Sequence, residues 1–206
     1  MATFENRIFD YFDTRVSTLG KIKARSLGAD VLTLTALKVL VYAQLEGGIK
    51  DLASCVLRDL NNRRMPVGDI NPRLLQWRNA EDIRQFKSVV TFEMIAAPSP
   101  FGQALRKRLR VNGINRKSEL NQMDWEAIRK VYNGLRLDHR SIEKLRGQIT
   151  LIVEDRNDAA HYGVLPTLGT TLMERQVREN AGIVEHVLTD FSLQLLPFFA
   201  SNLHRR

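Results

Sequence analysis

Three residues near position 160 have side chains that can act together on a phosphate group. Arg156 and Asn157 are adjacent in the sequence, and His161 follows four residues after the asparagine. The guanidinium is permanently charged and presents a planar set of donors that suits phosphate. The imidazole can take or give a proton near neutral pH, and the amide can both donate and accept hydrogen bonds. These residue types suffice for RNA cleavage without a metal or another cofactor.

In such a reaction the 2′-hydroxyl of the RNA is the internal nucleophile. His161 would handle its proton, and Arg156 would stabilise the negative charge that builds on the five-coordinate phosphate. The chain has four histidines, and His161 is the only one with neighbours suited to this work.

The element that must position these residues is a helix expected from Ser141 to Gly163. Arg156 falls inside its apolar stripe, where an unpaired charge is costly to bury. Asn157 and His161 are four residues apart and share a neighbouring face. The stripe itself follows helical spacing and contains Ile142, Leu145, Ile149, Ile152, Val153 and Ala160.

Within one regular helix, Arg156 and His161 point about 140° apart. They can meet at one phosphate only if the helix end unwinds or if a second chain contributes. In a two-fold homodimer, two copies of this helix could meet so that the arginines and histidines of both chains line one cleft. The apolar stripe would then face a polar groove between the subunits. Glu46 is a candidate ion-pair partner of Arg156.

A structural role explains the same residues without chemistry. In that interpretation Arg156 is paired with Glu46, and His161 only caps the end of its helix. The spacing alone does not decide between the two interpretations, because arginine is frequent in this sequence.

The composition is that of a basic protein with an ordinary core. Its 206 residues, 44% of them hydrophobic, are enough for one sizeable domain, and the net charge of +8 points to a polyanionic partner. The single cysteine, Cys55, excludes an internal disulfide and suits a reducing compartment such as the cytoplasm. The sequence has no signal-peptide pattern at its beginning and no apolar run of about 18 residues, so no membrane association is expected.

Apolar spacing predicts two long helices in the first third of the chain. The first covers 4–19 and is closed by Gly20. The second covers 30–61, with Asp30 as its cap. Gly47 and Gly48 lie inside it and would let another backbone come close.

A last long helix is expected to begin at Thr170 or Thr171 and to be bent or ended by Pro197. No strand pattern and no internal repeat is present. The sequence therefore predicts an all-α fold, an antiparallel helical bundle with a middle insertion of short helices. A single domain, 1–206, would have its bundle core at about 4–61 and 138–200 and an irregular helical insertion at about 62–137.

Short helices are expected within the insertion, where proline and glycine turn signals multiply. One would run over 81–95 and another over about 124–132, with Asp124 as a cap.

The region 101–146 carries 12 lysines and arginines against 5 acidic residues. Such a run can bind nucleic acid or can simply be a solvated face. Few aromatic residues lie among the charges, so a surface for base stacking is not indicated. The candidate nucleic-acid-binding residues are Arg106, Lys107, Arg108, Arg110, Arg116 and Lys117.

The run RNDAAHYG at the end of an apolar helix resembles the signature of the HEPN superfamily. In that signature an arginine is followed after four to six residues by a histidine, often with an asparagine directly after the arginine. Upstream, VLVYAQLEGGIKDL resembles the long early helix of the MAE-like branch, which is found in bacterial defence and toxin settings. The resemblance covers about 30–61 and 138–200.

The resemblance implies an α-helical, dimeric, metal-independent endoribonuclease of toxin or defence type, with a cognate antitoxin protein as a candidate partner. By position, Arg156 and His161 would be catalytic, Asn157 supporting, and Glu46 the polar group of the early helix. Tyr162 is a further supporting candidate. Related toxins that are silenced by AMP transfer have their tyrosine two residues after the histidine, so this chain departs from them.

A second hypothesis belongs to a different class of protein. The chain would be a non-catalytic homodimeric module that binds nucleic acid or a partner protein through the basic region 101–146. Charge reversal in that region would then matter more than substitution of His161.

Overall fold

The computed structural model describes residues 3–63, 71, 74, 123–162 and 169–205. These residues form α-helices and no β-strand, which confirms the predicted all-α class. None of these helices combines the length and the apolar character that a membrane span requires. The helices are α1 (Phe4–Arg25), α2 (Val31–Arg63), α7 (Trp125–Gly134), α8 (Arg140–Glu143), α9 (Arg146–Tyr162) and α10 (Thr170–Leu195).

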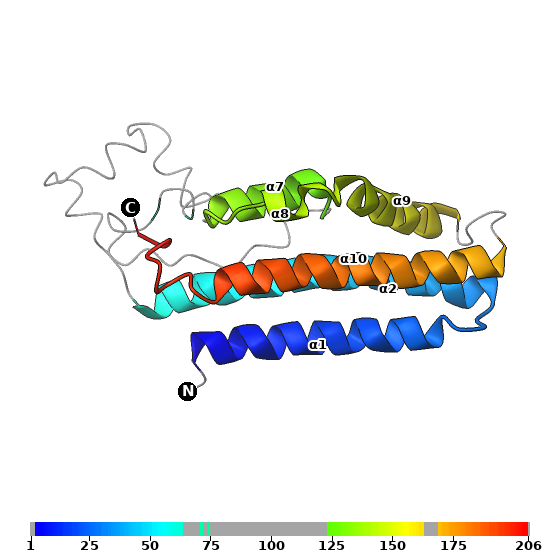
Figure 1. Ribbon diagram of the computed structural model, residues 1–206, viewed down its shortest axis with the longest axis horizontal. Coiled ribbons are helices and arrows are strands. Elements are labelled where there is room, and N and C mark those ends of the chain that lie inside the picture. The colour runs from blue at the N-terminus through cyan, green and yellow to red at the C-terminus, as the bar shows by residue number, and fades with distance from the viewer. Residues whose placement is uncertain (1–2, 64–70, 72–73, 75–122, 163–168, 206) are drawn as a thin grey trace, which may run out of the picture.

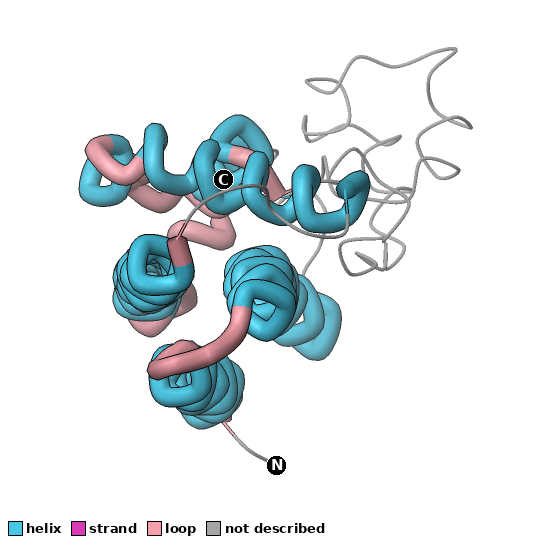
Figure 2. The backbone as a smooth tube through the Cα atoms, turned by 90° about the vertical axis from the view of Figure 1, so that its right-hand side faces the viewer, coloured by secondary structure: helices cyan, strands magenta, loops and turns pink. Residues whose placement is uncertain are grey.

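The helices form three layers around a central pair (Figure 1). Helices α2 and α10 lie side by side and run in the same direction, and α1 lies against both of them in the opposite direction. On the other side lies an outer row in which α7 and α8 overlap in this view and α9 comes after them, with α9 packed mainly on α2. The view along the bundle shows the same layers end-on (Figure 2). The predicted bundle is thus present, and α9 is one of its outer helices.

Helix α1 is longer than the sequence predicts. It begins after Thr3, whose hydroxyl accepts a hydrogen bond from Asn6 N at 3.2 Å, and it continues through Gly20 to Arg25. An internal glycine costs a helix only about 1 kcal/mol, and the extra turn buries Ile22 in the core. The prediction that Gly20 ends this helix is therefore wrong.

Helix α2 begins as predicted, because the Asp30 carboxylate accepts a hydrogen bond from Thr33 N at 2.8 Å. The atoms nearest to its two adjacent glycines belong to side chains of the neighbouring helices. A Cβ atom at Gly48 would lie 2.6 Å from the buried Leu188 side chain of α10. A Cβ atom at Gly47 would lie 2.7 Å from the Arg15 guanidinium of α1. The glycines let both neighbouring helices pack closely on α2.

The expected helix from 141 to 163 is two helices. The chain leaves helical geometry at Lys144 and Leu145, between the short α8 and α9. The break keeps Ile142 and Ile149 both buried, one from each helix. The single-helix prediction is wrong because the apolar spacing continues across the break.

The last helix, α10, has Gly169 at its N-cap position, so the predicted caps Thr170 and Thr171 lie inside the helix. Its end at Leu195, two residues before Pro197, is as predicted. The apolar residues at helical spacing on and just after this helix, from Met173 to Phe198, are buried.

Part of the predicted insertion is described. Helix α7 starts at the predicted cap, where the Asp124 carboxylate accepts a hydrogen bond from Ala127 N at 2.8 Å. The helix expected over 81–95 lies outside the described residues.

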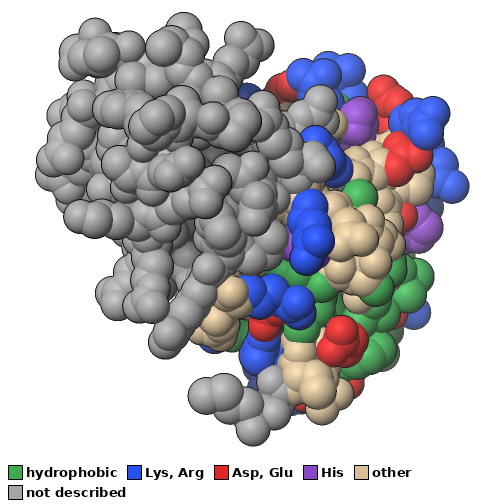
Figure 3. All heavy atoms as spheres, turned by 90° about the vertical axis from the view of Figure 1, so that its left-hand side faces the viewer, with side chains coloured by type: hydrophobic (Ala, Val, Ile, Leu, Met, Phe, Trp, Pro, Cys, Tyr) green, Lys and Arg blue, Asp and Glu red, His purple; other side chains and the backbone are tan. Residues whose placement is uncertain are grey.

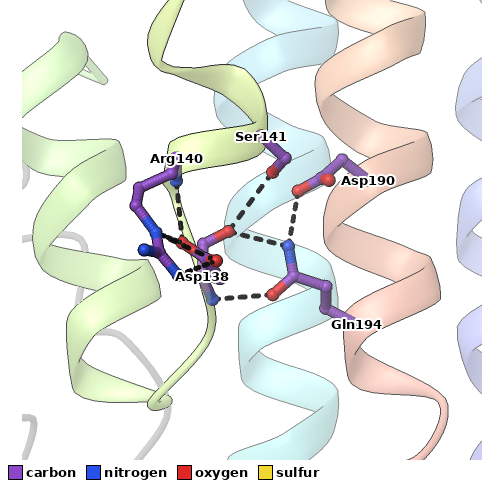
Figure 4. Close-up of polar contacts among 5 residues, drawn as sticks. All are labelled: Asp138, Arg140, Ser141, Asp190 and Gln194. Atoms are coloured by element: carbon purple, nitrogen blue, oxygen red, sulfur yellow. Dashed lines mark hydrogen bonds and ion pairs between the residues drawn. The ribbon is translucent and has the colours of Figure 1, made fainter.

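A polar cluster fastens the segment between α7 and α8 to α10 (Figure 4). The Gln194 amide accepts a hydrogen bond from Asp138 N at 2.7 Å and donates to Asp138 O and to Asp190 Oδ2, both at 2.8 Å. The Asp138 carboxylate pairs with Arg140, and Ser141 Oγ donates to Asp138 O at 3.3 Å. This cluster holds the chain that leads into α9.

Candidate functional site

The helix that carries the three candidate residues is covered by its own chain. Ile149, Ile152 and Val153 of α9 are buried in the core, as the stripe predicts. Ala160 is exposed and Ala159 is buried in its place, so the end of the stripe is corrected by one residue. Because α2 and α10 cover the stripe, it does not face a groove between subunits, and that prediction is wrong.

Arg156 lies on this covered face and is partly buried. Its Cζ atom is 5.4 Å from the centroid of the Tyr42 ring of α2, within the range of a cation–π interaction. Its Nη1 donates a hydrogen bond to Asn157 Oδ1 at 3.0 Å. An aromatic face and an amide thus accommodate the charge that interrupts the apolar stripe.

Glu46 does not form the predicted ion pair with Arg156 among the described residues. Its carboxylate pairs with Lys50, one turn further along α2. Glu46 nevertheless lies near the site, because its carboxylate interacts with the Tyr42 side chain. The Tyr42 hydroxyl accepts a hydrogen bond from Met123 N at 2.9 Å. Burial raises the pKa of Tyr42, and the nearby Glu46 carboxylate adds to that rise. Tyr42 thus interacts with both the Glu46 carboxylate and the Arg156 guanidinium.

His161 lies in the last turn of α9 and is exposed. The helix remains regular through Tyr162, so its end does not unwind to bring His161 toward Arg156. The two side chains leave opposite sides of α9, as expected from the angle of about 140° between them. Asn157 lies between these two directions and contacts Arg156. One chain thus brings together Arg156 and Asn157, and it presents His161 on the outer surface.

A buried polar network beside Arg156 was not predicted. The Lys38 side chain of α2 is 1% exposed, and its Nζ lies 3.0 Å from Asp155 Oδ2 and 2.8 Å from Gln176 Oε1. Asn180 of α10 donates to the same carboxylate at 3.3 Å. The sequence held a signal for this network, because Lys38 lies among the apolar positions of α2, one turn before Tyr42.

The remaining candidates can be placed only in part. Tyr162 is the last residue of α9, and its side chain lies outside the described residues. The six basic candidates between Arg106 and Lys117 also lie outside them. The described remainder of the basic region includes Arg129, paired with Glu126, and Arg140, paired with Asp138. The end of the molecule shown in Figure 3 accordingly has basic, acidic and histidine side chains mixed on its described surface.

The part of the chain that the structure describes contains no group of three or more histidine, cysteine, aspartate or glutamate side chains that could hold a metal ion. Its only cysteine, Cys55, is buried in the core.

Comparison with protein-family models matches residues 4–194 to the family described as MAE_28990-like HEPN. No curated protein and no solved structure matches the chain. The matched range extends from the start of α1 to the last turn of α10. It therefore includes the helix with Arg156 and His161 and the helix with Tyr42.

Proposed function

This chain belongs to the MAE_28990-like HEPN family, and from that premise we propose that it is a metal-independent endoribonuclease. One observation carries the proposal beyond the family. The Arg156 guanidinium lies over the Tyr42 ring and is hydrogen-bonded to Asn157, whose side chain lies between the directions of Arg156 and His161. A cation and a titratable imidazole that meet at one phosphate suit the transfer of that phosphate during RNA cleavage.

The reaction follows from these groups. His161 takes the proton of a ribose 2′-hydroxyl, whose oxygen forms a bond to the adjacent phosphorus. The bond between phosphorus and the 5′-oxygen of the next nucleotide breaks, and that oxygen takes up a proton. Arg156 stabilises the charge on the five-coordinate phosphate. The products are an RNA end with a 2′,3′-cyclic phosphate and an RNA end with a 5′-hydroxyl.

The site is proposed to be completed by a second copy of the chain. His161 and Arg156 leave α9 in different directions, so one phosphate can meet both groups when two copies of the helix face each other. The outer face of α9 also carries Leu151, which is 58% exposed. A single exposed leucine is ordinary on a protein surface, so the proposed homodimer rests on the divergence of Arg156 and His161.

The test uses pure protein and RNA in the presence of EDTA. His161→Ala and Arg156→Ala are each expected to lower the cleavage rate by about 100-fold or more, because each removes one group that acts on the transition state. Circular dichroism and the melting temperature should stay as in the wild type, since His161 is exposed and Arg156 lies at the edge of the core. An RNA analogue with 2′-deoxyribose at the cut position should not be cleaved.

Matched controls come from α10, where His186 and Arg175 are exposed. His186→Ala and Arg175→Ala should cleave as the wild type does. Unchanged cleavage in both His161→Ala and Arg156→Ala would contradict the proposed function. RNA binding without cleavage by the wild type would favour the non-catalytic binding module.

The biological setting is part of the same proposal. We propose a toxin or defence role in the cytoplasm, with RNA as the substrate and a cognate antitoxin as a candidate partner. Growth arrest on expression of the wild type, but not of His161→Ala, would support this setting.

A further inference from the structure

We infer that Lys38 is a positioning residue of the proposed site, because its ion pair with Asp155 fixes the rotation of α9 that places Arg156 on Tyr42. The inference rests on the proposed function wherever it concerns cleavage. The placement of Arg156 can be measured independently of any activity.

Lys38 is costly to bury. Lys38 is the only lysine, arginine or carboxylate in the buried set of the described residues. Moving an ammonium group out of water costs several kcal/mol, and an apolar side chain of similar size would fill the space without that cost. A lysine at this position is therefore explained better by the direction of its contacts than by the stability it adds.

The contacts of Lys38 are directional. Its Nζ lies 3.1 Å from Asp155 Oδ1, 3.0 Å from Asp155 Oδ2 and 2.8 Å from Gln176 Oε1. An ammonium has three donors, and three oxygens from two other helices surround this one. The Asp155 side chain is 25% exposed, so the pair lies at the rim of the core. Lys38 thus joins α2, α9 and α10 at one point.

The point where Lys38 joins the three helices lies next to the proposed site. Asp155 and Arg156 are consecutive, so they leave α9 about 100° apart. Lys38 and Tyr42 are four residues apart and lie on one face of α2. Asp155 is held by Lys38 and Asn180, while Arg156 lies on the Tyr42 ring. Two contacts in different directions fix the rotation of a helix about its axis, and with it the direction of Arg156.

The test replaces the ion pair with apolar side chains of similar size in Lys38→Met/Asp155→Leu. Such a replacement of a buried pair is often neutral or stabilising, so the melting temperature should not fall. The Nε–Hε signal of Arg156 in NMR reports its position over the Tyr42 ring through the ring current. This signal should move in the double variant, toward its position in Tyr42→Leu. The cleavage rate constant kcat should fall by about 10-fold to 100-fold.

A second ion pair between helices provides the matched control. Lys23 of α1 pairs with Glu185 of α10 at 2.5 Å, and neither residue lies on α9. Lys23→Met/Glu185→Leu should leave both the Arg156 signal and kcat unchanged. If the Lys38→Met/Asp155→Leu protein fails to fold, Lys38→Met alone takes its place, because the partly exposed Asp155 can turn to water.

The outcomes separate this inference from the proposed function. An unmoved Arg156 signal in the folded variant overturns the positioning role, whatever the activity. A moved signal with wild-type kcat also overturns it. A moved signal together with a loss of kcat that the control does not show supports it. A moved signal in a protein whose wild type does not cleave RNA supports the placement of Arg156 by Lys38 and overturns the proposed function.

Discussion

Two polar networks fasten the outer row of helices to the central pair, and they differ in their access to water. At α9, the Lys38 ammonium is fully buried, and its Asp155 partner lies at the rim of the core. At the entry to α8, the side chains of Asp138 and Arg140 are 51% and 79% exposed. The second network also uses backbone groups of Asp138, which Gln194 contacts from α10. The two ends of one row are thus held by different physical means.

The difference in exposure between the two networks indicates which part of the outer helices is held most strictly in position. An exposed network of several hydrogen bonds can lose one member and let water replace it. Water cannot replace a lost partner of a buried ammonium, so the partners of Lys38 must keep their positions. The strict network lies next to Arg156, and the permissive one lies at the other end of the row. We interpret this as a demand for accuracy at the residue that would meet phosphate.

The largest effect on stability is expected when the buried Lys38 loses its partner Asp155. Asp155→Ala leaves the Lys38 ammonium with Gln176 as its remaining partner, so the free energy of unfolding should fall by about 2–3 kcal/mol. Asp138→Ala is the matched change in the exposed network and should leave the unfolding free energy close to that of the wild type. Urea denaturation followed by circular dichroism measures both. Equal losses in the two variants would contradict the comparison.

A smaller effect is expected from acid. Hydrogen bonds from the Arg140 side chain and backbone lower the pKa of Asp138 to about 2, from an ordinary value of 3.8. The charged form is favoured in the folded state, so the contribution of this pair to stability is complete above pH 3.8 and is lost as the pH falls toward 2. An NMR titration of the Asp138 carboxyl group should therefore have its midpoint near 2. In Arg140→Gln the midpoint should rise toward 3.8, and a midpoint that did not move would show that Arg140 is not the cause.

The fold was predictable wherever apolar spacing determined it. The stripes of α2 and α10 are buried as expected, and Asp30 and Asp124 cap their helices. Errors lie at helix ends, where local signals compete with packing, and at the break between α8 and α9, which the continuous apolar spacing conceals. Gly20 was expected to end a helix, but the burial of Ile22 in the next turn outweighs its cost.

The site was predictable only in part. The spacing of residues along a helix gives the directions of their side chains, but it does not give the side chains that they contact on other helices. The divergence of Arg156 and His161 follows from the helical repeat alone. Lys38 lies 117 residues from Asp155 in sequence, and no local pattern links them. From the sequence, Glu46 could pair with Lys50 on its own helix or with Arg156 on another helix. In the structure it pairs with Lys50.

The central claim is that Arg156 and His161 act on one phosphate from two chains. The most direct measurement mixes the two inactive variants, Arg156→Ala and His161→Ala, after partial unfolding and reassembly. About half of the dimers would then contain one copy of each variant, and each would hold one intact site formed by the arginine of one chain and the histidine of the other. Cleavage should return to about a quarter of the wild-type rate. No recovery in a mixture shown by mass spectrometry to contain such heterodimers would contradict the account.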